Sequence, residues 1–143
     1  MTTGYPERIV CLTEETTETL YLLGEEWRIV GISGFTVRPP RARKEKPKVS
    51  AFLSAKIDRI LELQPDLVLG FSDLQADIAA TLVRHGIEVH VFNHRSIAEI
   101  FRMIRTLGGM IGCEAKTQAL CANLVAEVAA VRAAGLALPR RPR

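Results

Sequence analysis

Aromatic side chains recur where apolar segments of this chain end. Phe35 follows the run RIVGIS, Phe71 follows DLVLG, and Phe52 precedes the helical pattern IDRILELQ. A phenylalanine ring left in water forgoes roughly 1.5–3 kcal/mol of burial free energy. A single such ring most simply folds back onto the core, but three on one edge would form an apolar patch that marks a binding surface. We therefore predict that Phe35, Phe52 and Phe71 line a ligand site.

Residue patterns typical of catalysis are missing from the sequence. No Gly-x-Gly-x-x-Gly, Gly-x-Ser-x-Gly or Walker sequence occurs, and the first apolar run leads into CLTEETTE, whose carboxylates would repel a phosphate. His85, His90 and His94 have no nearby cysteine or carboxylate partner, which favours surface or cleft-edge histidines over metal ligands. The sequence thus favours a protein that is not an enzyme and requires no metal or cofactor.

Acidic side chains open two of the expected helices. Glu14, Glu15 and Glu18 lie at the start of the first helix, and Asp58 lies in the first turn of IDRILELQ. Their simplest role is a favourable interaction with the positive end of the helix dipole.

Short apolar runs alternate with segments of helical periodicity. Buried strands are expected at 8–12, 28–33, 66–70 and 87–92, with helices between them. Strand–helix–strand repetition implies parallel strands joined by right-handed crossovers. We therefore predict an α/β fold, a three-layer, doubly wound parallel sheet of about four strands.

Two segments exceed what a minimal domain of this class needs. The connection 34–55 is long and rich in proline, and connections of that length usually have a binding or lid role. Because the loops at the carboxyl ends of the strands gather at one edge, Pro40 and Ser50 are included among the expected ligand-binding residues. The last helix, 114–134, would be about 30 Å long. No further strand is expected after it, so we expect it to be a rigid connection that leads away from this domain toward a part that is absent.

Composition sets limits on size, compartment and partners. The chain has 143 residues, 48% of them hydrophobic, which fits a single core. The net charge is +3, and much of the excess of basic residues lies in two short stretches, 38–48 and 140–143. These are more typical of a solvated loop and a frayed tail than of a nucleic-acid surface. Three cysteines without a Cys-x-x-Cys pair indicate buried thiols.

The amino terminus and the hydropathy suggest a compartment. MTTGYPERIVCL has no basic region followed by a long apolar run, and no segment of transmembrane length is expected. The sequence by itself therefore indicates the cytoplasm.

Several stretches in a fixed order give the chain a family likeness. They are RIVCLTEETTETLYLLG, RIVGISGFTVRPP, PKVSAFLSAKIDRILELQPDLVLGF and VHVFNHRSIAEI. Together they resemble the amino-terminal lobe of class III periplasmic substrate-binding proteins, the helical-backbone type of cobalamin and iron-siderophore ABC importers. Within that family the pattern is most similar to the vitamin B12 binders. The most specific feature is a Pro-Pro loop after the second strand, then a short helix and a Leu-x-Pro-Asp-Leu-Val strand entry.

The resemblance implies roles for particular residues. Phe35, Phe52 and Phe71 occupy places where cobalamin binders have aromatic residues lining the corrinoid. Asp58 falls where such proteins have an acid, usually glutamate, that docks onto the membrane permease. The turn that contains Glu14 and Glu15 departs from the family pattern and is more acidic, which disfavours anionic ferric siderophores more than a corrinoid.

The resemblance also implies a division of the chain and a set of partners. Residues 1–112 would form the ligand-binding lobe, 113–135 the helix between two lobes, and 136–143 a disordered basic tail, with the second lobe absent. The expected partners are a corrinoid or siderophore and an ABC permease, no nucleic acid is expected, and the exposed half-cleft could support self-association. The resemblance implies a periplasmic or extracellular, membrane-associated protein, whereas the amino terminus and the hydropathy by themselves indicate the cytoplasm.

Two other interpretations stay open at this stage. The first is a cytoplasmic relative that senses or scavenges a corrinoid or siderophore without a transporter. The second is a small flavodoxin-like enzyme or response domain, for which Gly70-Phe71-Ser72-Asp73 is a poor phosphate or phospho-acceptor site.

Overall fold

The computed structural model describes residues 3–139 and shows a five-stranded parallel sheet. The strand order is β3-β2-β1-β4-β5, and the direction of winding reverses between β1 and β4. The strands are β1 (Ile9–Cys11), β2 (Ile29–Ser33), β3 (Lys48–Ser50), β4 (Leu67–Phe71) and β5 (Val89–Phe92). The predicted α/β class with a parallel sheet is confirmed.

One strand and one short helix were missed by the sequence analysis. The predicted four-strand sheet gains β3 at its edge, within the long connection 34–55, and the same connection contains the helix α2 (Ala42–Glu45). In β3 only Val49 is fully buried. A three-residue strand with a single buried apolar side chain is too short to show the period-two pattern by which strands are recognised.

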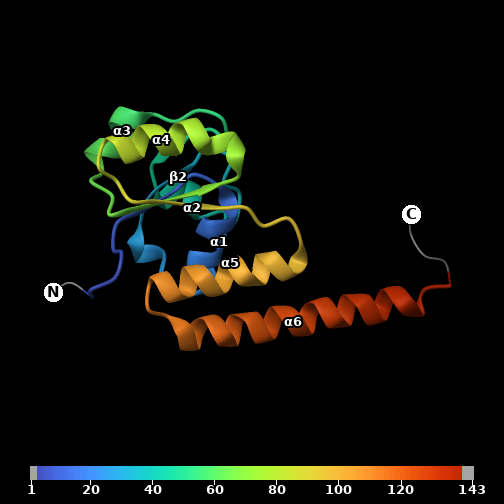
Figure 1. Ribbon diagram of the computed structural model, residues 1–143. Helices are drawn as coiled ribbons and strands as arrows, with labels where there is room; N and C mark the ends of the chain where they lie inside the picture. Colours follow the sequence, from blue (N-terminus) through green and yellow to red (C-terminus); the bar gives the residue numbers. More distant parts are fainter. Residues whose placement is uncertain (1–2, 140–143) are drawn as a thin grey trace.

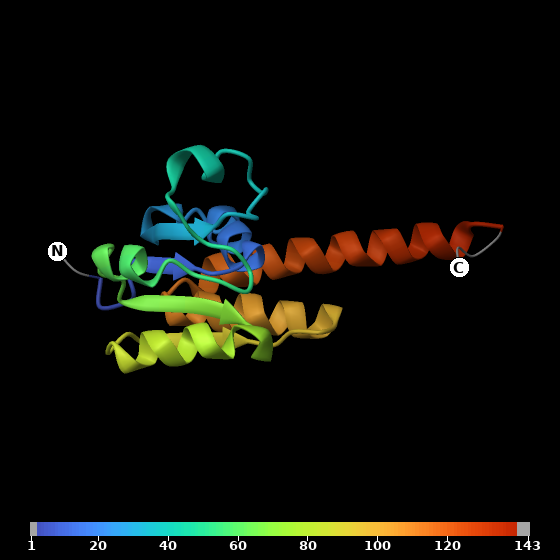
Figure 2. The same ribbon diagram turned by 90° about the horizontal axis from the view of Figure 1, so that it is seen from above.

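Helices cover both faces of the sheet, as Figures 1 and 2 show. On one face, α3 (Ile57–Glu62) and α4 (Ala76–Arg84) pack over Val10 and Val68. On the other, α1 (Glu14–Leu22) and α5 (Ile97–Met110) pack over Ile9 and Cys11. Neighbouring residues of β1 are therefore buried in the cores on opposite faces of the sheet. A strand buried on both faces is apolar without interruption. Two 3-10 turns complete the lobe, at Glu26–Arg28 and Asp73–Gln75.

The last helix, α6 (Glu114–Ala137), has 24 residues and extends well past the lobe (Figures 1 and 2). At 1.5 Å per residue it is about 36 Å long. Its first turns pack against α5, and a Cβ at Gly108 would overlap the Thr117 side chain, so this glycine permits the close approach of the two helices. The helix ends at Ala137 rather than at the predicted boundary of 135, and the disordered tail predicted for 136–143 stays a prediction. Residues 140–143 lie outside the described part of the chain.

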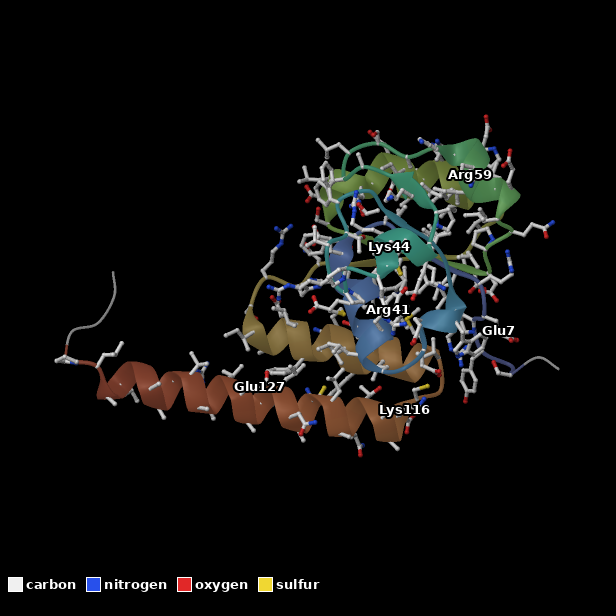
Figure 3. All side chains as sticks on the ribbon, turned by 180° about the vertical axis from the view of Figure 1, so that it is seen from behind. Glu7, Arg41, Lys44, Arg59, Lys116 and Glu127 are labelled. Atoms are coloured by element: carbon white, nitrogen blue, oxygen red, sulfur yellow. The ribbon has the colours of Figure 1, made fainter. Side chains whose placement is uncertain are left out.

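The second half of α6 is exposed and apolar. Val131 is 72% and Leu136 70% exposed. Figure 3 shows Lys116 on the half that packs on the lobe and Glu127 farther along the helix. By length and composition α6 could cross a membrane, with a mean hydropathy of 1.5 over 18 residues, so the expectation that no segment reaches that length is wrong. Alanine, valine and leucine raise this average, although the same composition also occurs in core helices of soluble proteins.

A buried group of charges fixes the start of α6 at the amino ends of the strands. Glu25 and Arg28 form an ion pair at 3.3 Å, with 9% and 4% of their side chains exposed. Arg28 also donates to the carbonyls of Pro6 and Ile111, and the Cys113 thiol donates to Glu25 at 2.7 Å. The contacts tie the segment before β1, the turn before β2 and the α5–α6 junction together.

The same contacts set the protonation of this group. Burial by itself would raise the pKa of the Glu25 carboxyl, but hydrogen bonds from Cys113 and Trp27 and the charge of Arg28 outweigh burial and lower it. Burial and the hydrogen bond to Glu25 raise the pKa of the Cys113 thiol. Glu25 is therefore held ionised and Cys113 held as a neutral donor.

Candidate ligand-binding site

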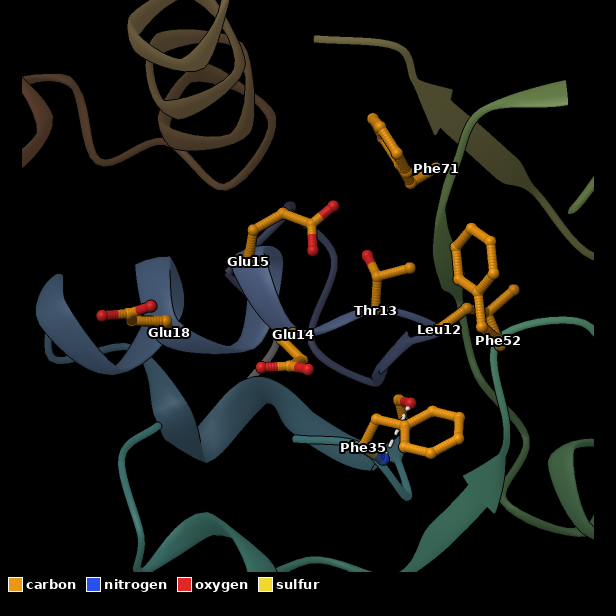
Figure 4. A pocket seen from close by; sticks show the side chains of 9 residues that line it. Leu12, Thr13, Glu14, Glu15, Glu18, Phe35, Phe52 and Phe71 are labelled. Carbon is orange, nitrogen blue, oxygen red and sulfur yellow. Dashed lines mark hydrogen bonds between the residues drawn. The ribbon is translucent and has the colours of Figure 1, made fainter. Parts of the chain in front are cut away.

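A cavity of about 490 Å³ opens where the strand order reverses, at the carboxyl ends of the strands. Its walls come from the segments that follow β1, β2 and β3 and from the end of β4, as Figure 4 shows. Clefts at this point of open α/β sheets are where ligands bind. The lining residues are Leu12, Thr13, Glu14, Glu15, Glu18, Ser33, Phe35, Phe52 and Phe71.

The structure brings the three predicted phenylalanines into this one cavity. Phe35 is 59% exposed, whereas Phe52 and Phe71 are half-buried. The backbone N–H of Phe35 donates to the Ser33 hydroxyl at 3.2 Å, which holds the turn after β2. The rings stand around the opening in Figure 4 rather than stacking on one another. Their geometry is that of an apolar rim able to contact a flat ligand.

A buried amide that the sequence analysis missed holds the backbone of two of these phenylalanines in place. The side chain of Gln75 is fully buried. Its amide nitrogen donates to the carbonyls of Phe52 at 2.9 Å and Leu12 at 3.3 Å, and its oxygen accepts from the N–H of Phe71 at 2.8 Å. Three separate segments of the cavity wall thus share one side chain.

Gly70 makes room for this amide. A Cβ there would lie 3.1 Å from the Gln75 oxygen, closer than ordinary van der Waals contact. Just after Phe71, Ser72 adopts a positive φ of 65°, and its hydroxyl accepts from the N–H of Leu74 at 3.1 Å. The chain therefore turns sharply at the end of β4 and presents Phe71 at the edge of the sheet.

The opposite wall is acidic. Glu14, Glu15 and Glu18 project from the first turns of α1 into the lining of the cavity. The hydroxyl of Thr13, at the start of α1, is buried without a hydrogen-bond partner in the structure.

His94 completes the edge next to this wall. Its Nε2 lies 3.5 Å from Glu15, and its ring packs against Phe71 with the centroids 4.7 Å apart. The cleft-edge position expected for a histidine thus applies to His94. Within residues 3–139, no three His, Cys, Asp or Glu side chains gather closely enough to hold a metal ion.

The other predicted site residues lie outside the cavity lining. Pro40 lines a neighbouring hollow of about 600 Å³, which shares Glu18 with the first. Ser50 is buried beneath the surface, and its carbonyl accepts from the N–H of Gly34 at 2.7 Å. Asp58 is exposed in the first turn of α3 and away from the lining. Their roles stay predictions.

Comparison with known proteins places the chain in a family. Residues 9–142 match the family described as periplasmic binding protein. The chain belongs to that family. The uncharacterized ABC transporter substrate-binding lipoprotein YvrC of Bacillus subtilis is 28% identical over 127 residues, which cover 86% of this chain and 40% of that protein. The cobalamin-binding protein of Halobacterium salinarum is 28% identical over 128 residues, covering 88% of this chain and 35% of that one.

Solved structures of the family share the fold. The periplasmic heme-binding protein RhuT from Roseiflexus sp. RS-1 superimposes with a TM-score of 0.86 at 26% identity, over 95% of this chain and 52% of that one. The chain thus spans about half the length, or less, of the proteins it matches. The predicted family and its helical-backbone architecture are confirmed. Members of the family are substrate-binding proteins rather than enzymes. The family therefore does not support the alternative of a flavodoxin-like enzyme or response domain.

Proposed function

We propose that this chain is a ligand-binding lobe of an ABC importer's substrate-binding protein, and that it holds cobalamin or a similar flat metal chelate without transforming it. The observation that supports this most directly is the gathering of Phe35, Phe52 and Phe71 around one cavity at the reversal of the strand order. A volume of about 490 Å³ falls within the usual range of small-molecule sites, roughly 300–1,000 Å³.

A second lobe would supply the other wall of the site. Small-molecule sites generally bury some 70–90% of their ligand, and this cavity covers one face only. The helix α6 leads away from the lobe with an exposed apolar half, and the relatives are about twice as long as this chain. We therefore expect the 143-residue chain alone to bind a corrinoid weakly.

Docking to a membrane permease is the further part of this proposal. Asp58 is exposed in the first turn of α3, where the family has an acid that contacts the permease. One exposed ion pair contributes only about 0–1 kcal/mol. Asp58 would accordingly orient the complex and help to select the partner, rather than supply most of the binding free energy.

The proposal is tested by titrating the isotopically labelled chain with cyanocobalamin and following its amide NMR signals. The amides of Thr13, Phe35 and Phe71 should shift at millimolar ligand. The double substitution Phe52→Ala and Phe71→Ala should weaken binding about tenfold or more, because each ring removed from a contact forfeits roughly 1.5–3 kcal/mol of burial.

A matched control replaces neighbouring apolar side chains that lie outside the cavity. Leu53 and Leu74 are 68% and 61% exposed, and changing both to alanine should leave the titration unaltered. Equal losses in the two double variants would contradict the aromatic site. Submicromolar affinity of the unmodified chain would instead contradict the need for a second lobe.

A further inference from the structure

The cavity lining has a one-sided charge. Of its nine residues, all in the described part of the chain, three are glutamates and none is lysine, arginine or histidine. Aromatic rings line the other side, and a ring face attracts cations through its quadrupole. Carboxylate oxygens only accept hydrogen bonds at neutral pH. The acidic wall therefore favours a ligand that presents hydrogen-bond donors or positive charge, and the aromatic wall is compatible with one except at Phe71, whose ring already has Arg95 over it.

An unpartnered hydroxyl indicates that the occupant has a polar group at this place. Thr13 is 6% exposed, and its Oγ1 has no hydrogen-bond partner in the structure. In Figure 4 the Thr13 side chain lies between Glu15 and Leu12, below Phe71 and inside the ring of lining residues. A buried hydroxyl without a partner costs about 1–3 kcal/mol. Since a hydroxyl both donates and accepts, a polar ligand group placed here would satisfy it, and the neighbouring carboxylates determine that this group is a donor.

Three basic side chains near the rim make other contacts, while Arg38 and Arg41 line the neighbouring hollow that shares Glu18. Arg95 lies over Phe71 at 5.0 Å and pairs with Asp73 at 4.0 Å. Arg43 donates to the carbonyls of Gly34 and Thr36, and His94 faces Glu15. Among these three, only His94 contacts one of the three lining glutamates, so most of the acidic wall remains available to a ligand.

We infer that the cavity selects metal chelates whose rim carries amide or cationic groups and discriminates against those whose rim carries carboxylates. The inference rests on the proposed function and narrows its ligand class. Carboxylates of a ligand would meet Glu14, Glu15 and Glu18 as like charges, and juxtaposed like charges are a common means of rejecting a wrong partner. Primary amides of the same shape would donate to the same glutamates.

Two corrinoids that differ only at the rim provide the test. Cyanocobalamin carries neutral amides, and hydrolysis of three of them gives the corresponding tricarboxylic acid on the same ring. NMR titration of the 143-residue chain should show the tricarboxylate binding at least about tenfold more weakly, and the difference should shrink as salt is raised because exposed charges are screened.

Neutral variants then locate the cause. The triple variant E14Q/E15Q/E18Q should weaken cyanocobalamin severalfold and bring the tricarboxylate to within about threefold of it, while E18Q alone should show part of this change. The matched control E62Q/E88Q/E127Q alters the net charge equally at exposed positions outside the cavity. It should preserve the tenfold difference.

The outcomes separate this inference from the proposed function. If both corrinoids shift the phenylalanine signals with equal affinity, the charge selection is wrong and the ligand site stands. An unchanged preference in the triple variant, whose folding the amide spectrum reports, would likewise contradict it. If neither corrinoid shifts these signals, the proposed function fails, and the inference fails with it.

Discussion

At the carboxyl ends of the strands Gln75 buries a neutral amide, whereas at the amino ends Arg28 and Glu25 bury a pair of charges. Both groups join segments that are distant in sequence: Gln75 connects three walls of the cavity, and Arg28 connects the entries of β1 and β2 to the α5–α6 junction. A neutral amide can position ligand-contacting loops without changing the charge of the cavity. A buried ion pair gives a rigid anchor where no ligand is expected.

The largest effect should come from breaking the ion pair. Replacing Arg28 with methionine leaves the buried Glu25 with only the exposed Lys116 as a charged partner, and removal of one partner of a buried pair costs about 3–5 kcal/mol. Urea denaturation of the purified chain measures the loss in free energy of unfolding. Lys116, 3.7 Å from Glu25 but 57% exposed, provides the control, since Lys116→Met should cost no more than about 1 kcal/mol. Similar losses in both variants would mean that the charges are not effectively buried.

Replacing Gln75 with leucine should have a smaller effect on stability and a larger one on the site. The change leaves the carbonyl of Phe52 and the N–H of Phe71 without a partner, at a cost of about 1–3 kcal/mol. The NMR signals around Phe52 and Phe71 should shift or broaden, and corrinoid binding should weaken, while the α5–α6 junction is unchanged. Gln118, exposed on α6, is the control position, and Gln118→Leu should alter neither signal nor stability. If Gln75→Leu changed neither the NMR signals, the stability nor the binding, the rings would be held by packing alone.

The smallest effect should be the pH-dependent part of the contribution that Glu25 makes to stability. The pKa of Glu25 is lowered below its ordinary value of 4.5 in the folded chain. Its ionised form therefore contributes stability above about pH 4.5, and this contribution is lost as the pH falls through the lowered folded pKa. The variant Glu25→Gln should be less stable than the unmodified chain at pH 7, with the gap closing toward pH 3 in urea unfolding. A gap that stays constant with pH would exclude ionisation of Glu25 as the source.

The sequence predicted those features that depend on regular patterns. Continuous apolar runs located β1, β2, β4 and β5, and the rule that parallel strands end at one edge placed the three phenylalanines together. Gln75 escaped notice because a single polar residue between a turn and a helix gives no periodic signal. Its role depends on contacts with carbonyls up to 63 residues away. Pro40 and Ser50 were predicted at the rim because the sequence shows that they lie in loops at that edge of the sheet. The direction and burial of a side chain in a loop depend on tertiary packing, which the sequence pattern does not show.

The thiol of Cys113 lies at the α5–α6 junction, so thiol reagents can be used to detect changes there. Cys11 and Cys121 are buried in the core, and burial raises the pKa of Cys11 to about 11. Cys113 is only partly covered, and burial together with the hydrogen bond that it donates to Glu25 raises the pKa of its thiol. Thiolate is the reactive form, so opening of the junction would release the Cys113 thiol from this bond before the core thiols are exposed. Alkylation of Cys113 should therefore report local opening at the start of α6.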